Sequence, residues 1–184
     1  MDLSFRDELE NEMDKILTED DIKLAMKGKV KIISYSELKG YNSLDDVLKP
    51  WDAVVILFAI TNPNSGHWTC IHRKKNGDVI FTDSYGLLPM DENHYIPYSI
   101  VKYVSDQFKP YIYKLFIDYH EGKVRYSQYR LQGKDTNVCG RYCILRLRFP
   151  ELSENEFAKL LKYGTTVEKW ITPDILVTML TSPI

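Results

Sequence analysis

The run from Trp51 to Ile60 constrains the fold of this chain most. It reads WDAVVILFAI, and apolar residues occupy successive positions from Ala53 onward. Side chains alternate between the two faces of a strand, so an unbroken apolar run predicts a strand buried on both faces. A loop is expected from Asn62 to Gly66, and a second strand from His67 to Arg73. The sequence therefore predicts a sheet with Trp51–Ile60 at its centre.

The remaining segments mix helical and extended patterns. Thr18 and Ser43 are expected to cap two short helices, and Asn76-Gly77 predicts a hairpin turn before a strand from Val79 to Asp83. Other helices are expected at Leu3–Ile16, Pro97–Phe108, Glu154–Tyr163 and from about Thr166, with Pro173 interrupting or restarting the last, and extended segments at Val30–Tyr35, Tyr111–Tyr119 and Val124–Leu131. No βαβ rhythm is present, which predicts an α+β fold with a central mixed β-sheet flanked by helices. Residues 1–184 are expected to form a single domain.

Cysteine usage and charge narrow the cellular compartment and the classes of partner that we expect. Cys70, Cys139 and Cys143 form an odd set without framework spacing, which indicates free thiols in a reducing compartment. The N-terminal segment is charged, and the apolar run from Ala53 to Ile60 is too short to span a bilayer, so neither secretion nor membrane insertion is expected. A net charge of −2 does not indicate nucleic-acid binding. Cys70 and Cys143 are assigned structural roles.

Arginines are frequent after Cys139. Arg141, Arg146 and Arg148 form a local basic run and are expected on a solvated helix face. Cys143 follows Cys139 by four residues, which is about one helical turn, and is expected to point inward.

The stretch from Leu131 to Leu145, LQGKDTNVCGRYCIL, places Cys139 where a polar loop becomes a buried helix. The free N–H groups and the positive end of the helix dipole at such a junction favour the thiolate, which is the nucleophilic form of cysteine. Gly140 removes side-chain bulk beside the sulfur, so that a substrate backbone can come close. The amide of Gln132 and the N–H of Cys139 can together hold an oxyanion.

A second group of residues lies far upstream of Cys139. His67 begins one strand and Asp83 ends the next, so a hairpin would place the imidazole beside the carboxylate. Asp83 can then orient His67, and His67 can take the proton of Cys139. Taken singly, a histidine after a loop is usually a surface residue and a strand-terminal aspartate usually a turn former. Together with Gln132, the four residues predict a catalytic site.

These residues resemble the motifs of the adenain-like cysteine proteases, which belong to the clan of the SUMO proteases. The resemblance covers about residues 50–150, with the family's His-Trp pair at His67-Trp68 and its acidic residue at Asp83. It implies that Gln132 is the oxyanion glutamine and Cys139 the nucleophile. Trp68 is a candidate wall of a narrow substrate channel, and Gly140 is a second candidate for substrate binding.

Two details favour the viral branch over the SUMO proteases. Val138 stands before the cysteine, where SUMO proteases usually have aspartate, and Gln132 lies seven residues before Cys139, as in adenain, rather than six. Tyr126 to Tyr129 also resembles the strand that leads to the adenain glutamine. Adenain itself is basic and is stimulated by DNA and a viral peptide. This chain is slightly acidic, so DNA is not carried over as a cofactor.

The resemblance implies a thiol endopeptidase that cleaves capsid or other virion precursor proteins, in the virion and in the host cytoplasm or viral factory. Its partner would be a polypeptide substrate; no cofactor is expected, and an activating peptide stays open. The alternatives are a protease of ubiquitin-like modifiers, an acyltransferase that forms an acyl-Cys139 intermediate, and an inactive binding module. A metal site from His67, Cys70 and His72 is disfavoured, because His67 would face away from the other two on the strand.

Overall fold

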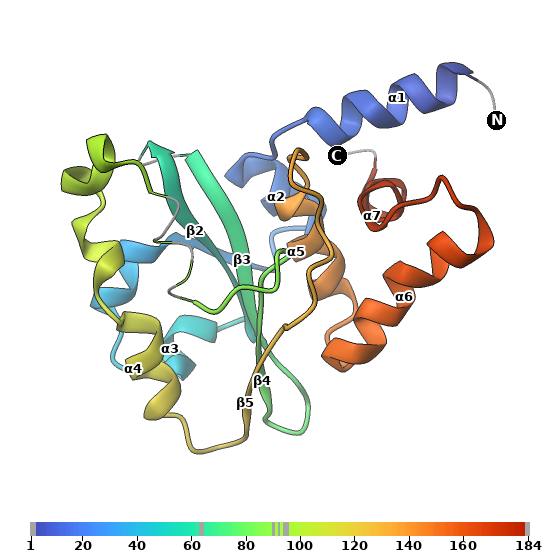
Figure 1. Ribbon diagram of the computed structural model, residues 1–184. Helices are drawn as coiled ribbons and strands as arrows, with labels where there is room; N and C mark the ends of the chain where they lie inside the picture. The colour runs from blue at the N-terminus through green and yellow to red at the C-terminus, as the bar shows by residue number, and fades with distance from the viewer. Residues whose placement is uncertain (1–2, 63–64, 90, 92, 94–95, 183–184) are drawn as a thin grey trace.

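In the computed structural model, which describes residues 3–62, 65–89, 91, 93 and 96–182, the strands form one mixed sheet in the order β1-β2-β3-β4-β5 (Figure 1). β1 pairs with β2 and β4 with β5 in parallel, whereas β2–β3 and β3–β4 are antiparallel. The expected α+β class with a central mixed sheet is therefore confirmed. The strands are β1 (Lys31–Ser34), β2 (Ala53–Asn62), β3 (Ser65–Arg73), β4 (Val79–Thr82) and β5 (Val124–Tyr126).

Helices cover both faces of this sheet. On one side lie α3 and α4, and on the other lies α5, with α6 and α7 outside it (Figure 1). Both Thr18 and Ser43 accept a hydrogen bond from a backbone N–H of the first helical turn, so the two expected caps are confirmed. The helices are α1 (Leu3–Asp14), α2 (Glu19–Ala25), η1 (Tyr35–Gly40), α3 (Leu44–Leu48), η3 (Tyr98–Tyr103), η4 (Ser105–Phe108), α4 (Tyr111–Ile117), α5 (Cys139–Arg148), α6 (Glu154–Val167) and α7 (Pro173–Thr181).

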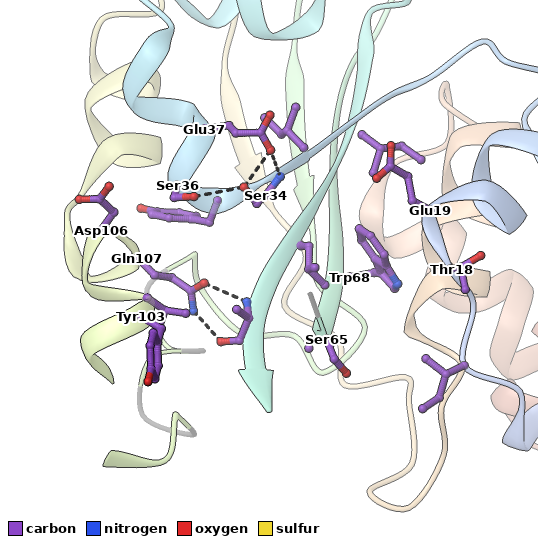
Figure 2. Close-up of a pocket in the computed structure, with 18 of the residues that line it drawn as sticks. Thr18, Glu19, Ser34, Ser36, Glu37, Ser65, Trp68, Tyr103, Asp106 and Gln107 are labelled. Atoms are coloured by element: carbon purple, nitrogen blue, oxygen red, sulfur yellow. Dashed lines mark hydrogen bonds between the residues drawn. The ribbon is translucent and has the colours of Figure 1, made fainter. Parts of the chain in front are cut away.

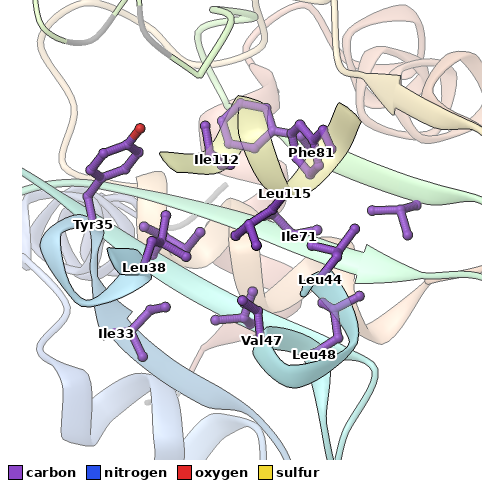
Figure 3. Packing of buried hydrophobic residues seen from close by; sticks show 14 of the residues in the cluster. Ile33, Tyr35, Leu38, Leu44, Val47, Leu48, Ile71, Phe81, Ile112 and Leu115 are labelled. Atoms are coloured by element: carbon purple, nitrogen blue, oxygen red, sulfur yellow. The ribbon is translucent and has the colours of Figure 1, made fainter. Parts of the chain in front are cut away.

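β2 is buried on both faces, as its apolar run predicts. Val54, Ile56 and Phe58 belong to a core between the sheet and η1, α3 and α4, part of which Figure 3 shows. Val55 and Leu57 belong to a second core on the opposite face, where the sheet packs against α2 and α5. This alternation within one strand holds the helical layers on either side of the sheet.

α5 is buried along most of its length. Its apolar residues divide between the second core and a third core shared with α6 and α7. The expectation of a solvated arginine face is wrong for Arg141 and Arg146, which are 0% and 1% exposed. Arg141 donates to the backbone of Glu12 and pairs with its carboxylate, and Arg146 donates to the carbonyls of Phe149 and Leu152. Both guanidinium groups thus donate to backbone carbonyls near the ends of neighbouring segments, and Arg141 also donates to side chains.

The segment expected as a strand at Tyr111–Tyr119 is instead the helix α4. Ile112, Leu115 and Phe116 are buried there, at the spacing i, i+3, i+4 that gives a helix one apolar face. The alternating tyrosines that suggested a strand lie at the edge of the core and are only partly buried. Packing of the three apolar side chains therefore decides the structure of this segment.

Other boundaries differ from expectation: β5 ends at Tyr126 rather than Leu131, and the last helix begins at Pro173 rather than near Thr166. The Pro97–Phe108 helix is two 3-10 helices that meet at Val104, and buried Gln107 of the second binds the backbone of β2. The Asn62–Gly66 loop is too long, because β2 includes Asn62 and β3 begins at Ser65; residues 63 and 64 lie outside the described part of the chain. α6 continues beyond Tyr163 to Val167 and passes Gly164, where a side chain would press against Ile171 and Leu176 of the following segment.

Gly66 permits the close approach of β2 and β3 just before His67. A Cβ atom at this position would lie 1.8 Å from the carbonyl oxygen of Phe58, which is a backbone atom that a rotamer change cannot move. The β2–β3 register is irregular immediately beyond this point, between Ala59 and Asn62. The strand pairing that carries His67 therefore depends on glycine here.

We expect Gly66→Ala to lower the free energy of unfolding by about 1–3 kcal/mol or more, because the new methyl group forces the two backbones apart. Gly40→Ala is the matched control: a Cβ there meets no atom within 4 Å, and the change should stay within about 0.5 kcal/mol. Urea unfolding of both variants measures the difference. Equal stability of the two variants would contradict the proposed close approach.

Candidate active site

His67 and Asp83 are joined by a buried hydrogen bond. His67 lies near the start of β3 and Asp83 directly follows β4, so the antiparallel pairing brings their side chains together. The Nε2 atom of His67 lies 2.8 Å from Oδ2 of Asp83, and the two residues are 4% and 1% exposed. With Nε2 bound to the carboxylate, Nδ1 is the ring nitrogen that can serve the thiol.

The turn after β4 fixes the Asp83 carboxylate. Its Oδ1 atom accepts the backbone N–H groups of Tyr85, at 2.7 Å, and Leu87, at 3.3 Å. Gly86 has a φ of +73°, and a Cβ there would lie 2.9–3.1 Å from the backbone of residues 129 and 130. The turn therefore holds Asp83 rigidly and packs directly against the segment that leads to Gln132.

Cys139 is the first residue of α5 and is only partly buried, as expected from the loop-to-helix transition. Its side chain lies close enough to His67 to help raise the pKa of that imidazole. Burial by itself would lower the pKa of His67, but the Asp83 carboxylate and the Cys139 side chain outweigh it and raise that pKa well above 6.5. A charged imidazolium is thus favoured between two groups that can carry negative charge, which is the arrangement that activates a thiolate.

Gln132 is held by two hydrogen bonds that orient its amide. Oε1 accepts from the Ser84 hydroxyl at 2.6 Å, and Nε2 donates to the carbonyl of Thr136 at 2.7 Å. Ser84 also accepts the backbone N–H of Gln132 through its own carbonyl. Because a carboxamide nitrogen carries two hydrogens, the second can still donate to a substrate oxygen. The assignment of Gln132 to an oxyanion hole stays a prediction.

Trp68 and Gly140 touch each other beside the candidate catalytic pair. The Trp68 ring donates from Nε1 to the carbonyl of Leu17. A Cβ on Gly140 would lie 3.3 Å from Trp68 and 3.2 Å from Leu17. Gly140 therefore has a packing role that the sequence did not suggest, because it lets the start of α5 rest on Trp68. Their contact with substrate stays a prediction.

A groove of about 720 Å³ opens on the Trp68 side of β3 (Figure 2). Gly66 and Trp68, the neighbours of His67, line it together with residues 16–19, the end of β1 and residues 103–107. Gln107 forms part of the wall and pairs its amide with both the N–H and the carbonyl of Ala59, at 2.9 and 3.1 Å. These two bonds satisfy the β2 edge beyond the end of β1 and keep the wall in place.

Sequence reasoning missed Ser84 and Tyr85. The Tyr85 ring stacks on His67 with the centroids 5.0 Å apart, and the Arg130 guanidinium lies over the Tyr85 ring at 5.9 Å. The two residues directly follow Asp83, and this position beside the candidate acid is the sequence signal that points to them. Their partners His67 and Gln132 lie far away in sequence and become visible only in the fold.

The remaining candidates do not add a metal or membrane site. Within the described part of the chain, no group of three or more His, Cys, Asp and Glu side chains is arranged to hold a metal ion. His72 instead directs Nε2 to the carbonyl of Pro150, and burial lowers its pKa to about 3. Cys70 and Cys143 are buried, the latter pointing inward as expected. None of the described helices has the length and apolarity needed to cross a membrane.

Some known proteins are similar to this chain in sequence or in fold. No family model matches the chain. A Sputnik virophage protein described as uncharacterized protein V9 is 36% identical over 163 residues, which cover 88% of this chain and 91% of that protein. The ASFV pS273R protease superposes with a TM-score of 0.50 at 16% identity, over 91% of this chain and 67% of that one. The chain therefore shares the fold of this protease, in agreement with the cysteine-protease resemblance predicted from the sequence.

We expect Asp83→Asn to lower the pKa of His67, because burial remains while the main stabilising charge is lost. In the wild-type protein, the stability added by this proton is complete below about pH 6.5 and is lost as the pH rises through the raised pKa. Imidazole NMR titration, assigned with His67→Asn, measures the shift. Asp52→Asn removes the same charge beside Arg73 at the opposite end of β3 and should leave the His67 titration unchanged.

A haloacetamide at neutral pH should alkylate Cys139 about tenfold or more faster than the other two thiols. Cys139 is partly exposed and lies near His67, whereas Cys70 and Cys143 are buried. Burial, together with the adjacent Cys70 thiol, also raises the pKa of Cys143. Peptide mapping after brief labelling gives the order. Labelling of Cys143 ahead of Cys139 in the folded protein would contradict the assignment of the nucleophile.

Proposed function

The chain belongs to the family of the Sputnik virophage protein V9, and from this premise we propose that it is a cysteine endopeptidase that cleaves capsid or other virion precursor proteins. The observation that carries the proposal is the buried His67–Asp83 hydrogen bond, with the Cys139 side chain near enough to help raise the pKa of the same imidazole. A nucleophile, a base and a group that orients the base is the arrangement required for nucleophilic acyl transfer.

The proposed reaction has two halves. The Cys139 thiolate attacks the carbonyl carbon of the peptide bond, and the developing oxyanion accepts hydrogen bonds from the Gln132 amide and the Cys139 N–H. His67 then donates its proton to the leaving amine, and an acyl-Cys139 thioester remains. Water attacks this thioester while His67 takes its proton, which releases the new carboxyl end and restores the thiolate.

The groove beside Trp68 supports a polypeptide substrate rather than a small molecule. Gly66 and Trp68, the chain neighbours of His67, line it together with residues 16–19 and 103–107, whereas the four candidate catalytic residues do not line it. Both serine and carboxylate side chains line it, as Ser34, Ser65 and Glu37 illustrate in Figure 2. An extended chain can exchange hydrogen bonds with such walls along its length. The relative is a virophage protein, so a viral protein is the substrate class that we propose.

We expect the wild-type protein to cleave at least one virion precursor polypeptide from a panel that also contains SUMO-type precursors and an acetyl donor. Mass spectrometry of the new ends identifies the bond. Cys139→Ala should abolish cleavage because it removes the nucleophile. Cys70→Ala, which removes a buried thiol, should retain cleavage.

Each result on the panel has a distinct meaning. Processing of only the SUMO-type precursors would favour the modifier protease, and acetylation without cleavage would favour the acyltransferase. Cleavage by Cys139→Ala at the wild-type rate would overturn the assigned nucleophile.

A further inference from the structure

Asp174 lies far from Cys139 in the sequence but reaches the loop that precedes it. It stands in the first turn of α7 and is 5% exposed. Its Oδ2 atom accepts the Gly133 N–H and the Thr136 hydroxyl, both at 2.9 Å, while Oδ1 accepts the Tyr142 hydroxyl at 2.7 Å. One carboxylate therefore ties α7 to α5 and to both ends of the 133–136 segment.

This segment directly follows the candidate oxyanion donor and supplies the acceptor that orients it. Gln132 immediately precedes Gly133, and its Nε2 atom donates to the carbonyl of Thr136 at 2.7 Å. A displacement of the 133–136 segment would thus move both the backbone that carries the amide and the acceptor that orients it. Ser84 holds the rest of the residue: its hydroxyl donates to Oε1, and its carbonyl accepts the backbone N–H of Gln132.

The contacts at Asp174 require a carboxylate and glycine together. A Cβ at Gly133 would lie 2.9 Å from Oδ2, so glycine allows the carboxylate to approach the backbone. All three donors are neutral groups, and their hydrogen bonds offset the cost of burying the charge. Burial and Asp174 raise the pKa of Tyr142, which keeps its hydroxyl protonated as a donor. An asparagine has one acceptor oxygen and cannot accept at both positions.

We propose that Asp174 is a positioning residue that holds the 133–136 segment, and through it the Gln132 amide, in the geometry that stabilises the oxyanion. The inference rests on the proposed endopeptidase function. It predicts that α7 contributes to the rate of the chemical step although Asp174 itself contacts no reacting atom.

A double-mutant cycle tests the catalytic part. Gln132→Ala removes the donor and should lower kcat by about 10²–10³. Asp174→Asn only loosens the donor and should lower kcat by about 10–10², with little change in KM. The two losses should not multiply, so the double variant should be no slower than Gln132→Ala. Alkylation of Cys139 by a haloacetamide forms no acyl oxyanion and should stay within about twofold of wild type. Multiplied losses, or an equal loss in alkylation, would overturn the proposal.

Hydrogen exchange tests the anchoring without a substrate. Asp174→Asn should accelerate amide exchange at residues 133–137 and leave β3 protected. Thr178→Val is the matched control on α7, since it removes a hydroxyl that bonds the Asp174 carbonyl and spares the carboxylate. Unchanged exchange at residues 133–137 in Asp174→Asn would overturn the proposal. If the wild-type protein cleaved no polypeptide, the proposed function would fail, and exchange alone would decide whether Asp174 holds the segment.

Discussion

The contact between the start of α5 and β3 is the constraint on which the candidate site depends. His67 and Trp68 are neighbours on β3, and Cys139 and Gly140 are neighbours on α5. Gly140 has no side chain, so the first turn of α5 can rest on the Trp68 ring and on Leu17. The same turn of α5 that packs Gly140 against Trp68 also places Cys139 near His67. The packing of Gly140 on Trp68 thus sets the position of the Cys139 thiol relative to the His67 imidazole.

Burial makes the hydrogen bond between His67 and Asp83 strong as well as costly. A buried imidazole with no carboxylate beside it loses its proton, as His72 illustrates with a pKa of about 3. His67 is buried to a similar degree, yet its pKa is raised, because Asp83 lies 2.8 Å away and is itself fixed by two backbone N–H groups. Two histidines on one strand therefore have opposite charge preferences, and the difference comes from the turn after β4.

The sequence predicted what local patterns determine. The apolar run of β2, the Thr18 and Ser43 caps and the pairing of His67 with Asp83 each depend on short segments or on one hairpin, and each is present. The helix α4 was predicted as a strand because alternating tyrosines masked the spacing of Ile112, Leu115 and Phe116, which only a packing partner reveals. Likewise, nothing in the local sequence distinguishes a buried arginine that reaches α1 from an arginine that faces water.

The residues that hold the site come from most of the chain rather than from the 50–150 region that carries the motif resemblance. The carbonyl of Leu17 accepts a hydrogen bond from the Trp68 ring, and Glu12 pairs with Arg141 at the start of α5. Asp174 accepts a hydrogen bond from the segment before Cys139. Short-range signals identify the reacting groups because their chemistry restricts the residue type. Supporting groups need only the right distance and an acceptor atom, which many residue types supply. Candidate reacting groups can therefore be proposed from sequence, whereas the groups that support them need the fold.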